Sequence, residues 1–593
     1  MEMKREQKVE RTIVLQGADL GGTTAEMASW LNPKRRCGAS SLVLLSIVLF
    51  GVSMILFLAS LVMLNHGEGT AALTAASLHT PPRNIIFMVS DGFGLPGVTL
   101  ARDDLRRRTG NSSAQLMLDS ILIGLSETSS ADSMVTDSAA GATAWSCAQK
   151  TNNYYLAVDT EERPCGTLME AAKDGGMLTG IVSTSSVTDA TPAAFASHVR
   201  RRGLEHSVAL QLAKTQTSSE LILGGGLGWF RPQGLVGDLA AGKLGDGRPW
   251  SVVNDTAAML DATKLPLLGL FAEDDLPWEI DRVASQVPSL EQMTRKAIEM
   301  LAAAGTDERG FFLLVEGAKI DKAAHPNDAA AFVREVFQYD AAVGAAIEFA
   351  SSDGQTLVIS VSDHETGGLS LARGVINAEP KSEPLRYEAP LRTRSFAAEA
   401  EGVIDTSYSV SFEALDAVNA SSQTMLSRAM TALATEWRNG TNASEADLLV
   451  ELRRADSGAQ LRGRLVAKLN EAVASATPFE LMAHEESLIV EAVGFLPKLG
   501  PYVVQRAIAT IVSARARIGW STWGHSGADV LLHGFGPGTD QLRGNLANSE
   551  IGARVARMMG WDLQRTTAMI GTPEMAPQDV EQNGAFASWP GPR

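Results

Sequence analysis

Residues 135–145, with the sequence VTDSAAGATAW, place a serine between an acidic residue and a run of small residues. Asp137 is a type of residue that begins helices, and the alanines behind it can continue one. A helix that begins here puts the Ser138 hydroxyl at its N-terminus, where free N–H groups and the helix dipole favour negative charge. Ser138 is therefore a candidate nucleophile toward an anionic ester, although the same pattern is also typical of a serine that only begins a helix.

A serine hydroxyl needs a neighbouring base or a metal ion to become a nucleophile. The Gly-x-Ser-x-Gly motif that orients the serine of many hydrolases does not surround Ser138. Aspartates and histidines at spacings typical of metal ligands occur instead in the rest of the catalytic region. This pattern favours activation of the serine by metal.

Four segments with the pattern of inner strands, each followed by an acidic residue, predict an α/β sheet with a site at one edge. Segments that are apolar at nearly every position are typical of strands buried on both faces. An acidic residue just past such a strand lies at the carboxyl edge of the sheet, where open α/β proteins place their sites. The pairs are residues 84–90 with Asp91, residues 179–184 with Asp189, residues 311–315 with Glu316, and residues 356–361 with Asp363.

Three of the nine histidines stand in settings typical of metal ligands. Asp321 and His325 are four residues apart, so on a helix both side chains face the same way and can share one metal. His364 directly follows Asp363 at a predicted strand end. His525 lies in a loop flanked by glycines, which makes it a plausible last ligand.

Residues 186–192, SVTDATP, bring two oxygen-bearing side chains close together. Asp189 and Thr191 offer the oxygen ligands that suit Mg²⁺. Three arginines follow at residues 200–202, of which one can bind phosphate in a bidentate manner and two are expected to be solvated. The glycines at residues 224–226 are expected to form a loop, because no Gly-Lys-Ser/Thr of a phosphate-binding P-loop follows them.

At 593 residues the chain is long enough for one large domain with insertions. Its formal net charge of −17 argues against nucleic-acid binding, which needs a basic surface. Residues 369–512 are helical in pattern and are expected to form an insertion that covers the site or makes a subunit interface. Residues 566–593 form a polar tail.

An uncharged apolar run at residues 41–64 is long enough to span a membrane as a helix, since about 20 residues suffice. The basic residues 34–36 precede it, so the positive-inside rule predicts a cytosolic tail (residues 1–40) and a lumenal or external catalytic part. Residues 65–82 form a stalk of small residues. We interpret the segment as a single-pass type II signal anchor; cleavage near residues 70–80 is the alternative.

Two further features agree with a catalytic part outside the cytosol. Cys147 and Cys165 can close a loop by a disulfide, which would stabilise the fold by about 3 kcal/mol in the loop-entropy model, although they could also be two buried thiols. Five Asn-x-Ser/Thr triplets are possible glycosylation sites. They lie at Asn111, Asn254, Asn419, Asn439 and Asn442.

Together the motifs resemble the alkaline phosphatase family over residues 83–370 and 515–565. They are Asp91-Gly92, TDSAA at residues 136–140, DATP at 189–192, Glu316-Gly317, Asp321 with His325, DHETGG at 363–368 and Gly524-His525-Ser526. The anchor, the DHETGG form and the cysteine context are most similar to the fungal vacuolar (repressible) branch of that family. The resemblance implies a three-layer α/β sandwich with a central, mostly parallel sheet over residues 83–565, and hydrolysis of small phosphate monoesters.

The resemblance also implies two zinc ions and one magnesium ion per subunit, a phosphoserine intermediate on Ser138, and a homodimer. The first zinc would bind Asp321, His325 and His525, the second Asp363, His364 and Asp91, and magnesium Asp91, Thr191 and Glu316, with Asp189 a direct or water-mediated member. Arg202 falls at the position of the phosphate-binding arginine. Lys322 could reach phosphate through water.

Two other functions stay open at this point. A phosphodiesterase or sulfatase of the same superfamily usually carries its nucleophile, a Thr or a Cys or Ser converted to formylglycine, in a different motif. A membrane-anchored scaffold with an inactive site usually lacks a nucleophile or ligand, and none is missing here. Zinc content would separate the scaffold from the enzymes.

Overall fold

A computed structural model describes residues 81–214, 219–305, 309–371, 376–377, 403–404, 410–438, 445–454, 458–577 and 579. The predicted tail, the membrane segment at residues 41–64 and most of the stalk lie outside these residues. Within the described ranges, none of the helices is long and apolar enough to cross a membrane. The type II anchor therefore stays a prediction.

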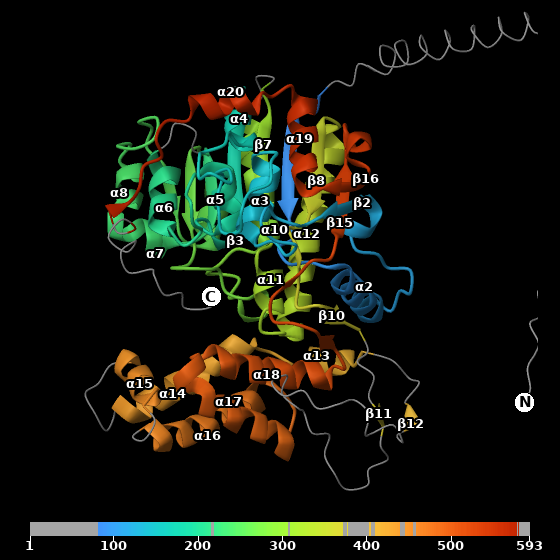
Figure 1. Cartoon of the computed structure of the whole chain (residues 1–593), viewed down its shortest axis with the longest axis vertical. Coiled ribbons are helices and arrows are strands. Elements are labelled where there is room, and N and C mark those ends of the chain that lie inside the picture. Colours follow the sequence, from blue (N-terminus) through green and yellow to red (C-terminus); the bar gives the residue numbers. More distant parts are fainter. Residues whose placement is uncertain are drawn as a thin grey trace, which may run out of the picture. The chain divides into compact units, whose positions relative to one another are not determined.

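A ten-stranded sheet forms the centre of the described chain (Figure 1). In spatial order its strands are β16 (Gly544–Ala547), β2 (Leu122–Glu127), β15 (Val530–Phe535), β8 (Thr356–Val361), β1 (Asn84–Val89), β7 (Phe311–Glu316), β3 (Leu178–Ser186), β4 (Leu221–Gly225), β6 (Leu267–Leu270) and β5 (Ser251–Val253). Within this sheet, β15 runs antiparallel to its neighbours β8 and β2, and the other neighbouring strands run parallel. The predicted, mostly parallel sheet is confirmed.

The register of the central strands aligns their carboxyl ends. Val89, the last residue of β1, pairs with both Glu316 of β7 and Val361 of β8. Ser183 of β3 also pairs with Glu316. Each strand that precedes a predicted acidic residue therefore ends at the same edge of the sheet, which is what the sequence pattern predicts.

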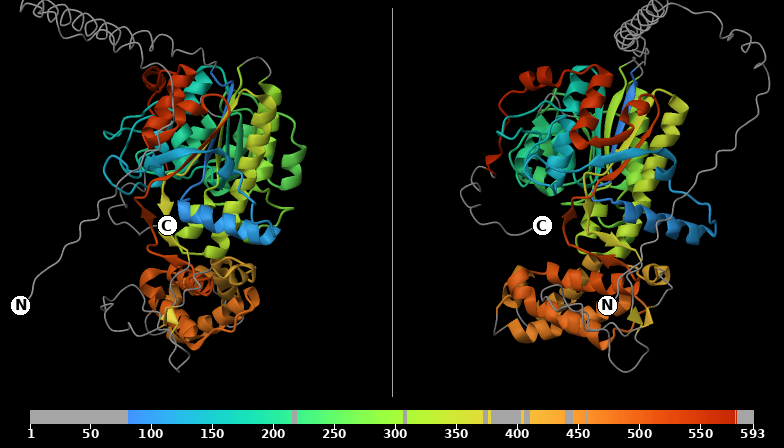
Figure 2. Two further views of the ribbon diagram at one scale, coloured as in Figure 1. Left: turned by 90° about the vertical axis from the view of Figure 1, so that its right-hand side faces the viewer. Right: turned by 45° about the vertical axis from the view of Figure 1, so that its right-hand side comes forward.

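Helices pack on both faces of the sheet, and the side chains of β1 alternate between two cores. Ile86 and Met88 belong to one core, and Ile85, Phe87 and Val89 to the other. The first core contains α2 (Leu95–Thr109), α9 (Thr256–Asp261), α10 (Leu290–Ala304), α11 (Lys319–Ala324) and α12 (Ala329–Asp353). The second contains α3 (Ser138–Ser146), α4 (Leu168–Asp174), α5 (Ala190–Ala196), α6 (Glu205–Lys214), α7 (Leu227–Phe230), α8 (Leu235–Ala240) and α19 (Asn548–Met559), with α20 (Leu563–Met569) packed against it. Figure 2 shows the resulting three layers.

The described part of residues 369–512 is mostly helical, with three two-residue strands, β10 (Leu369–Ser370), β11 (Ile376–Asn377) and β12 (Val403–Ile404). Its helices, drawn in orange in Figures 1 and 2, are α13 (Phe412–Asp416), α14 (Ser422–Arg438), α15 (Glu445–Leu452), α16 (Gly458–Ala476) and α17 (Ala483–Leu499), followed by α18 (Tyr502–Arg515). Their buried side chains continue the core of α10 and α12. The backbone N–H of Ser422 donates to Asp328, the N-cap of α12 (2.7 Å), which ties the two helical groups together.

The expected loop at residues 224–226 is wrong, because Gly224 and Gly225 end strand β4. A side chain on Gly225 would lie 1.9 Å from the backbone oxygen of Asp274, and one on Gly224 would lie 2.7 Å from Val187. These glycines therefore allow close approach of neighbouring backbone inside a buried strand. Only Gly226, with φ of +98°, leaves the strand and begins α7.

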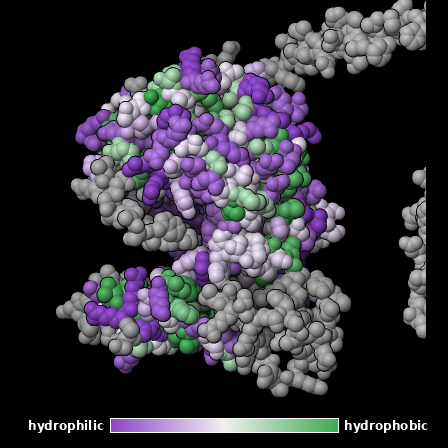
Figure 3. Space-filling view, in the orientation of Figure 1, coloured by the Kyte–Doolittle hydropathy of each residue, from purple (hydrophilic) through white to green (hydrophobic). Residues whose placement is uncertain are grey.

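The surface agrees with the acidic composition. On the face drawn in Figure 3, hydrophilic side chains predominate over the part of the chain that holds the sheet, with scattered hydrophobic ones between them. The glycosylation triplets that the structure describes, at Asn111, Asn254 and Asn419, have exposed asparagines. Asn439 and Asn442 lie outside the described residues.

Candidate functional site

The predicted nucleophile begins a helix. Asp137 is the N-cap of α3, and its Oδ1 accepts hydrogen bonds from the backbone N–H groups of Ala140 (3.0 Å) and Tyr154 (2.9 Å). Ser138 is the first helical residue and is 2 % exposed. Its hydroxyl lies 3.2 Å from Nε2 of His364. The structure therefore brings the predicted serine together with a predicted metal ligand.

The first group of candidate ligands consists of Asp321, His325 and His525, whose ligand atoms lie within 4.8 Å of one another. Asp321 and His325 come from α11 and its end, as the four-residue spacing predicts. His525 is brought beside them by a short antiparallel pairing of β14 (His525–Ser526) with β9 (Glu365–Thr366).

The second group consists of Asp91, Asp363 and His364, with ligand atoms again within 4.8 Å of one another. Nε2 of His364 lies 3.1 Å from Asp363 Oδ2 and 3.7 Å from Asp91 Oδ1. All three side chains are buried. They follow the adjacent strands β1 and β8, so the predicted convergence of strand ends forms this group directly.

The hydrogen bonds fix the tautomers of all three histidines. Nδ1 of His325 donates to the backbone oxygen of Trp523 (2.7 Å), and Nδ1 of His525 donates to that of Thr136 (2.8 Å). The hydroxyl of Thr366 donates to Asp321 (2.5 Å), so it can only accept from Nδ1 of His364 (3.1 Å). Each Nε2 therefore keeps a lone pair that faces the acidic residues, which is the arrangement of metal-binding histidines.

Glu316, Thr191 and Asp189 lie at the same sheet edge. Glu316 accepts hydrogen bonds from the hydroxyls of Ser183 (2.5 Å) and Ser185 (3.3 Å), while the hydroxyl of Thr191 is buried without a hydrogen-bond partner among the described residues. Burial raises the pKa of Glu316 to about 7, an effect that the hydrogen bond from Ser183 opposes. The two oxygens of Asp189 are held by Arg202 (2.9 Å) and Lys322 (2.7 Å).

Asp189 is the centre of a chain of alternating charges. Arg202 also donates to Asp137 Oδ2 (3.2 Å), and Lys322 also donates to both oxygens of Asp275 (2.7 and 2.8 Å). Burial alone would raise the pKa of Asp189, but Lys322 and Arg202 hold it well below its usual range. The other two arginines of the cluster at residues 200–202 are exposed, as expected. Asp275 was not predicted, because it lies in a loop after β6 without any motif.

The two groups of candidate ligands have the properties of metal sites. Oδ1 of Asp91 is buried and has no hydrogen-bond partner among the described residues. Burial, and then repulsion by Asp363, Asp321 and Glu316, raises the pKa of Asp91 well above its usual range. A bound cation would give the unpaired oxygen of Asp91 a partner and would offset the repulsion between the buried carboxylates.

The histidines around the first group also have the arrangement expected of a metal site. Nε2 of His325 and Nε2 of His525 face one another at 3.3 Å, and the rings of His364 and His525 are stacked with centroids 3.4 Å apart. Burial, followed by the nearby His364, lowers the pKa of His525 to about 4. The ring is therefore neutral at neutral pH, and two lone pairs that face each other at this distance fit a shared cation.

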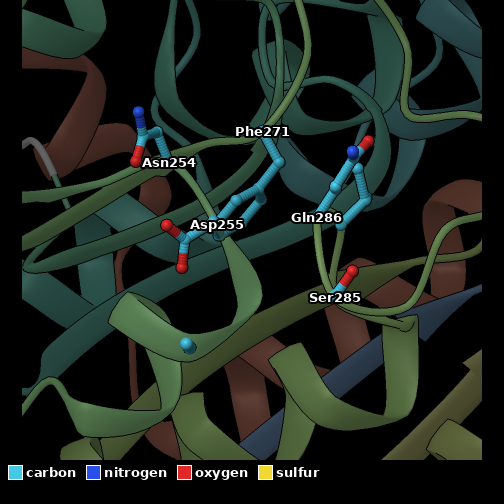
Figure 4. Close-up of a pocket in the computed structure, with 7 residues that line it drawn as sticks. Asn254, Asp255, Phe271, Ser285 and Gln286 are labelled. Atoms are coloured by element: carbon cyan, nitrogen blue, oxygen red, sulfur yellow. The ribbon is translucent and has the colours of Figure 1, made fainter.

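A separate open pocket of about 460 Å³ lies near β5 and β6 (Figure 4). Asn254, Asp255, Phe271, Ser285 and Gln286 are among the residues that line it. The carboxylate of Asp255 accepts from the backbone N–H of Ala258 (2.8 Å) as the N-cap of α9, so it has a structural role. None of the lining residues belongs to either group of candidate ligands.

Comparisons with known proteins agree with this geometry. The family model described as "Alkaline phosphatase" matches residues 82–441. The chain belongs to the alkaline phosphatase family. It is 33 % identical to the repressible alkaline phosphatase of Saccharomyces cerevisiae over 571 residues, which cover 91 % of this chain and 90 % of the yeast protein.

Two further relatives support the assignment. The chain is 34 % identical to an alkaline phosphatase of Schizosaccharomyces pombe over 485 residues, covering 79 % of this chain and 80 % of that protein. The crystal structure of Thermus thermophilus alkaline phosphatase superimposes with a TM-score of 0.62 at 26 % identity, covering 86 % of this chain and 96 % of that one. The alkaline phosphatase fold predicted from the motifs is confirmed, and the chain is a phosphatase.

In this alkaline phosphatase, Cys147 and Cys165 form a disulfide with Cα atoms 5.8 Å apart. The alternative of two buried thiols is therefore wrong. The residues predicted to hold the two zinc ions coincide with the two groups that the structure brings together. The identity and number of the metal ions, and the roles of the individual site residues, stay predictions.

Proposed function

We propose that this phosphatase hydrolyses small phosphate monoesters through a phosphoserine intermediate on Ser138, with two zinc ions and one magnesium ion. The observation that carries the proposal is the position of the Ser138 hydroxyl, which is buried at the N-terminus of α3 and 3.2 Å from Nε2 of His364. A serine in that place has a candidate metal ligand on one side and a helix terminus that favours negative charge.

The donor sets support the assignment of the ions. Asp321, His325 and His525 would hold one zinc, and Asp91, Asp363 and His364 the other, since zinc binds imidazole and carboxylate ligands. The oxygen-only set of Asp91, Thr191 and Glu316 suits magnesium, with Asp189 as a direct or water-mediated member. When bound, these ions would lower the pKa of the nucleophile and stabilise charge on the attacking and leaving oxygens.

The chain's own residues perform the positioning. The guanidinium of Arg202 is 29 % exposed and is oriented by Asp137 and Asp189, so its outer edge can hold two oxygens of a phosphoryl group. Oγ of Ser138 attacks phosphorus, a new O–P bond forms, and the bond to the alcohol breaks as the alcohol takes up a proton. Water then cleaves the phosphoserine, which returns a proton to Ser138 and releases phosphate.

Hydrolysis of p-nitrophenyl phosphate by the full chain, measured against pH before and after EDTA, tests the proposal. Ser138→Ala is measured beside it, with its zinc content as the control for an intact site. We expect activity that is lost with EDTA, restored by Zn²⁺ with Mg²⁺, and absent in the variant. Activity that survives chelation or the substitution contradicts the serine mechanism. Bound zinc without activity on monoesters would instead favour a phosphodiesterase or sulfatase, and neither zinc nor activity would favour a scaffold.

We further propose that the enzyme is a glycosylated type II membrane protein with a lumenal catalytic part, in the vacuole or at the cell surface, and that it is a homodimer. The uncharged run at residues 41–64 after a basic segment supports the topology. The disulfide Cys147–Cys165 supports an oxidising compartment. The dimer rests on family membership alone.

These proposals have separate tests. Protease added to sealed membranes should spare the catalytic part and remove the tail at residues 1–40, and glycosidase treatment should lower the apparent mass. Cleavage of the catalytic part in sealed vesicles contradicts the topology. Sedimentation of the detergent-solubilised chain decides between monomer and dimer.

A further inference from the structure

Arg506 of α18 lies between two aromatic rings. Its guanidinium carbon is 4.4 Å from the centre of the Tyr502 ring and 4.5 Å from the centre of the Trp523 ring. Both distances allow cation–π attraction, and two rings together fix the orientation of the planar guanidinium. The three residues, Tyr502, Arg506 and Trp523, are called the arginine sandwich below.

The arginine sandwich is tied to the first group of candidate ligands. The backbone oxygen of Trp523 accepts the hydrogen bond from Nδ1 of His325 (2.7 Å). At its other end, α18 is anchored to the segment after α11, because the Ser513 hydroxyl donates to the backbone oxygen of Asn327 (2.6 Å). Through these contacts, the helical insertion brings a cation near the segment that carries His325. His325 belongs to the first group of candidate ligands, whereas Ser138 contacts His364 of the second group.

Arg506 keeps its charge available. Among the described residues, no carboxylate lies within ion-pair distance of its guanidinium, and its Nε is buried without a hydrogen-bond partner. Other arginines of the insertion are paired: Arg515 of α18 binds Glu485 (2.5 Å), and Arg464 of α16 binds Glu436 (2.7 Å). A partly buried cation without an anion is costly, so an anionic ligand would stabilise this arrangement.

The side of the site on which the arginine sandwich lies indicates which part of the substrate it meets. In an in-line displacement, the attacking and leaving oxygens are on opposite sides of phosphorus. Ser138 contacts His364 of the second group. In the proposed mechanism, the group that contains His325 is therefore the one that faces the leaving alcohol.

We propose that the arginine sandwich is a subsite for the alcohol part of the substrate and selects phosphate monoesters in which that part carries a second negative charge. A carboxylate or a second phosphate would accept hydrogen bonds from the outer nitrogens of Arg506. Tyr502 and Trp523 hold the guanidinium in place and so limit the entropy lost on binding. The proposal rests on the proposed function.

The test compares two substrates that differ at one carbon, 3-phosphoglycerate with its carboxylate and glycerol 3-phosphate without it. For the full-length enzyme we expect the ratio of kcat/KM values to favour 3-phosphoglycerate. Arg506→Gln should lower this ratio about tenfold, as expected for the loss of one hydrogen bond between charged groups, mainly through KM. Arg506→Lys should restore part of it, and Arg464→Gln, the matched control on α16, should leave the ratio unchanged.

A second readout does not depend on turnover. In the Ser138→Ala background, calorimetric titration should show that Arg506→Gln weakens binding of 3-phosphoglycerate about tenfold more than binding of glycerol 3-phosphate. Equal effects on both ligands, with an unfolding midpoint like that of the parent, overturn the proposal. If Arg506→Gln fails to fold, Arg506→Lys and Tyr502→Leu, which removes the ring, carry the test, and an unchanged ratio in both overturns it.

The experiments distinguish a failure of the proposed function from a failure of the proposed subsite. A wild-type enzyme that hydrolyses neither glycerol 3-phosphate nor p-nitrophenyl phosphate contradicts the proposed function. A wild-type enzyme that hydrolyses both, but whose preference does not respond to Arg506, contradicts only the subsite.

Discussion

Nζ of Lys322 lies 2.7 and 2.8 Å from the two carboxylate oxygens of Asp275, so this lysine is shared between Asp275 and Asp189. The sharing reduces the positive charge that Lys322 can offer to a phosphate group. Asp275 also accepts a hydrogen bond from the backbone N–H of Ser186 (3.1 Å), which holds its carboxylate at the end of β3. It is therefore well placed to set the electrostatic balance of the site.

Substitution Asp275→Asn is expected to tighten the binding of inorganic phosphate, the product. The change removes one negative charge next to Lys322 while it keeps the shape of the side chain. We expect the inhibition constant of phosphate to fall roughly threefold to tenfold, in line with about 1 kcal/mol for a partly buried charge pair. Competitive inhibition of p-nitrophenyl phosphate hydrolysis measures the effect. Glu273→Gln, which removes a charge that is paired with the exposed Arg231, is the control, and weaker phosphate binding in Asp275→Asn would contradict the argument.

Substitution Asp91→Asn should stabilise the metal-free protein and weaken its metal binding. The carboxylate is buried, one oxygen lacks a hydrogen bond, and three other acidic residues raise its pKa. Removal of that charge at pH 8 should raise the free energy of unfolding after EDTA by about 1–3 kcal/mol. Calorimetry with and without EDTA, together with the zinc content, checks both effects. If the metal-free variant is less stable than the metal-free parent, the buried carboxylate of Asp91 does not destabilise the metal-free protein.

Substitution Gly92→Ala should separate the end of β1 from α11. Gly92 has φ of +76°, and a Cβ there would lie 2.6 Å from Cα of Asp321. We expect a loss of zinc and a destabilisation of about 2 kcal/mol or more. Gly110→Ala is the matched control, because Gly110 also has positive φ (+63°) but nothing lies within 4 Å of the added carbon. Equal zinc content in the two variants would contradict this account.

His533 on β15 should make stability depend on pH below neutrality. Burial lowers its pKa to about 4, although its hydrogen bond to the backbone oxygen of Ser360 opposes the shift. Between pH 6.5 and 4 the unfolded chain binds more protons, so stability falls as the pH falls through this window, by up to about 3 kcal/mol. Urea unfolding of the metal-free protein at pH 7.5 and pH 4.5 should show a smaller difference for His533→Asn than for the parent. An unchanged difference would mean that the ring is protonated in the fold.

The edge of the sheet could be predicted because its signal is local. Strands β1, β7 and β8 are mostly apolar, β3 is apolar only in its first half, and an acidic residue ends or follows each of the four within three residues. Parallel strands bring such positions together at one edge without any knowledge of the connections between them. The pairs Asp321 with His325 and Asp363 with His364 were predictable for the same reason. The first pair is four residues apart on one helix, and the second consists of neighbours in the sequence.

The other features of the site and the fold depend on contacts between segments that are distant in the sequence. A local sequence pattern does not reveal such contacts. Asp275 reaches Lys322 from a loop 47 residues earlier in the chain. Arg506 is one of many arginines in a helical region, and only the fold places it against Trp523. The glycines of β4 were mistaken for a loop because their signal, close approach of the backbone, is visible only when the neighbouring chain is in place.

The two oxygens of Asp137 serve different partners. Oδ1 caps the helix that begins with Ser138, and Oδ2 orients Arg202. A substitution at this one position would shift the nucleophile and the phosphate-holding arginine at the same time. Adaptation of the enzyme to new esters is therefore expected to occur at residues that contact either Ser138 or Arg202 but not both. A change at Asp137 cannot alter the position of the nucleophile without also altering that of the arginine.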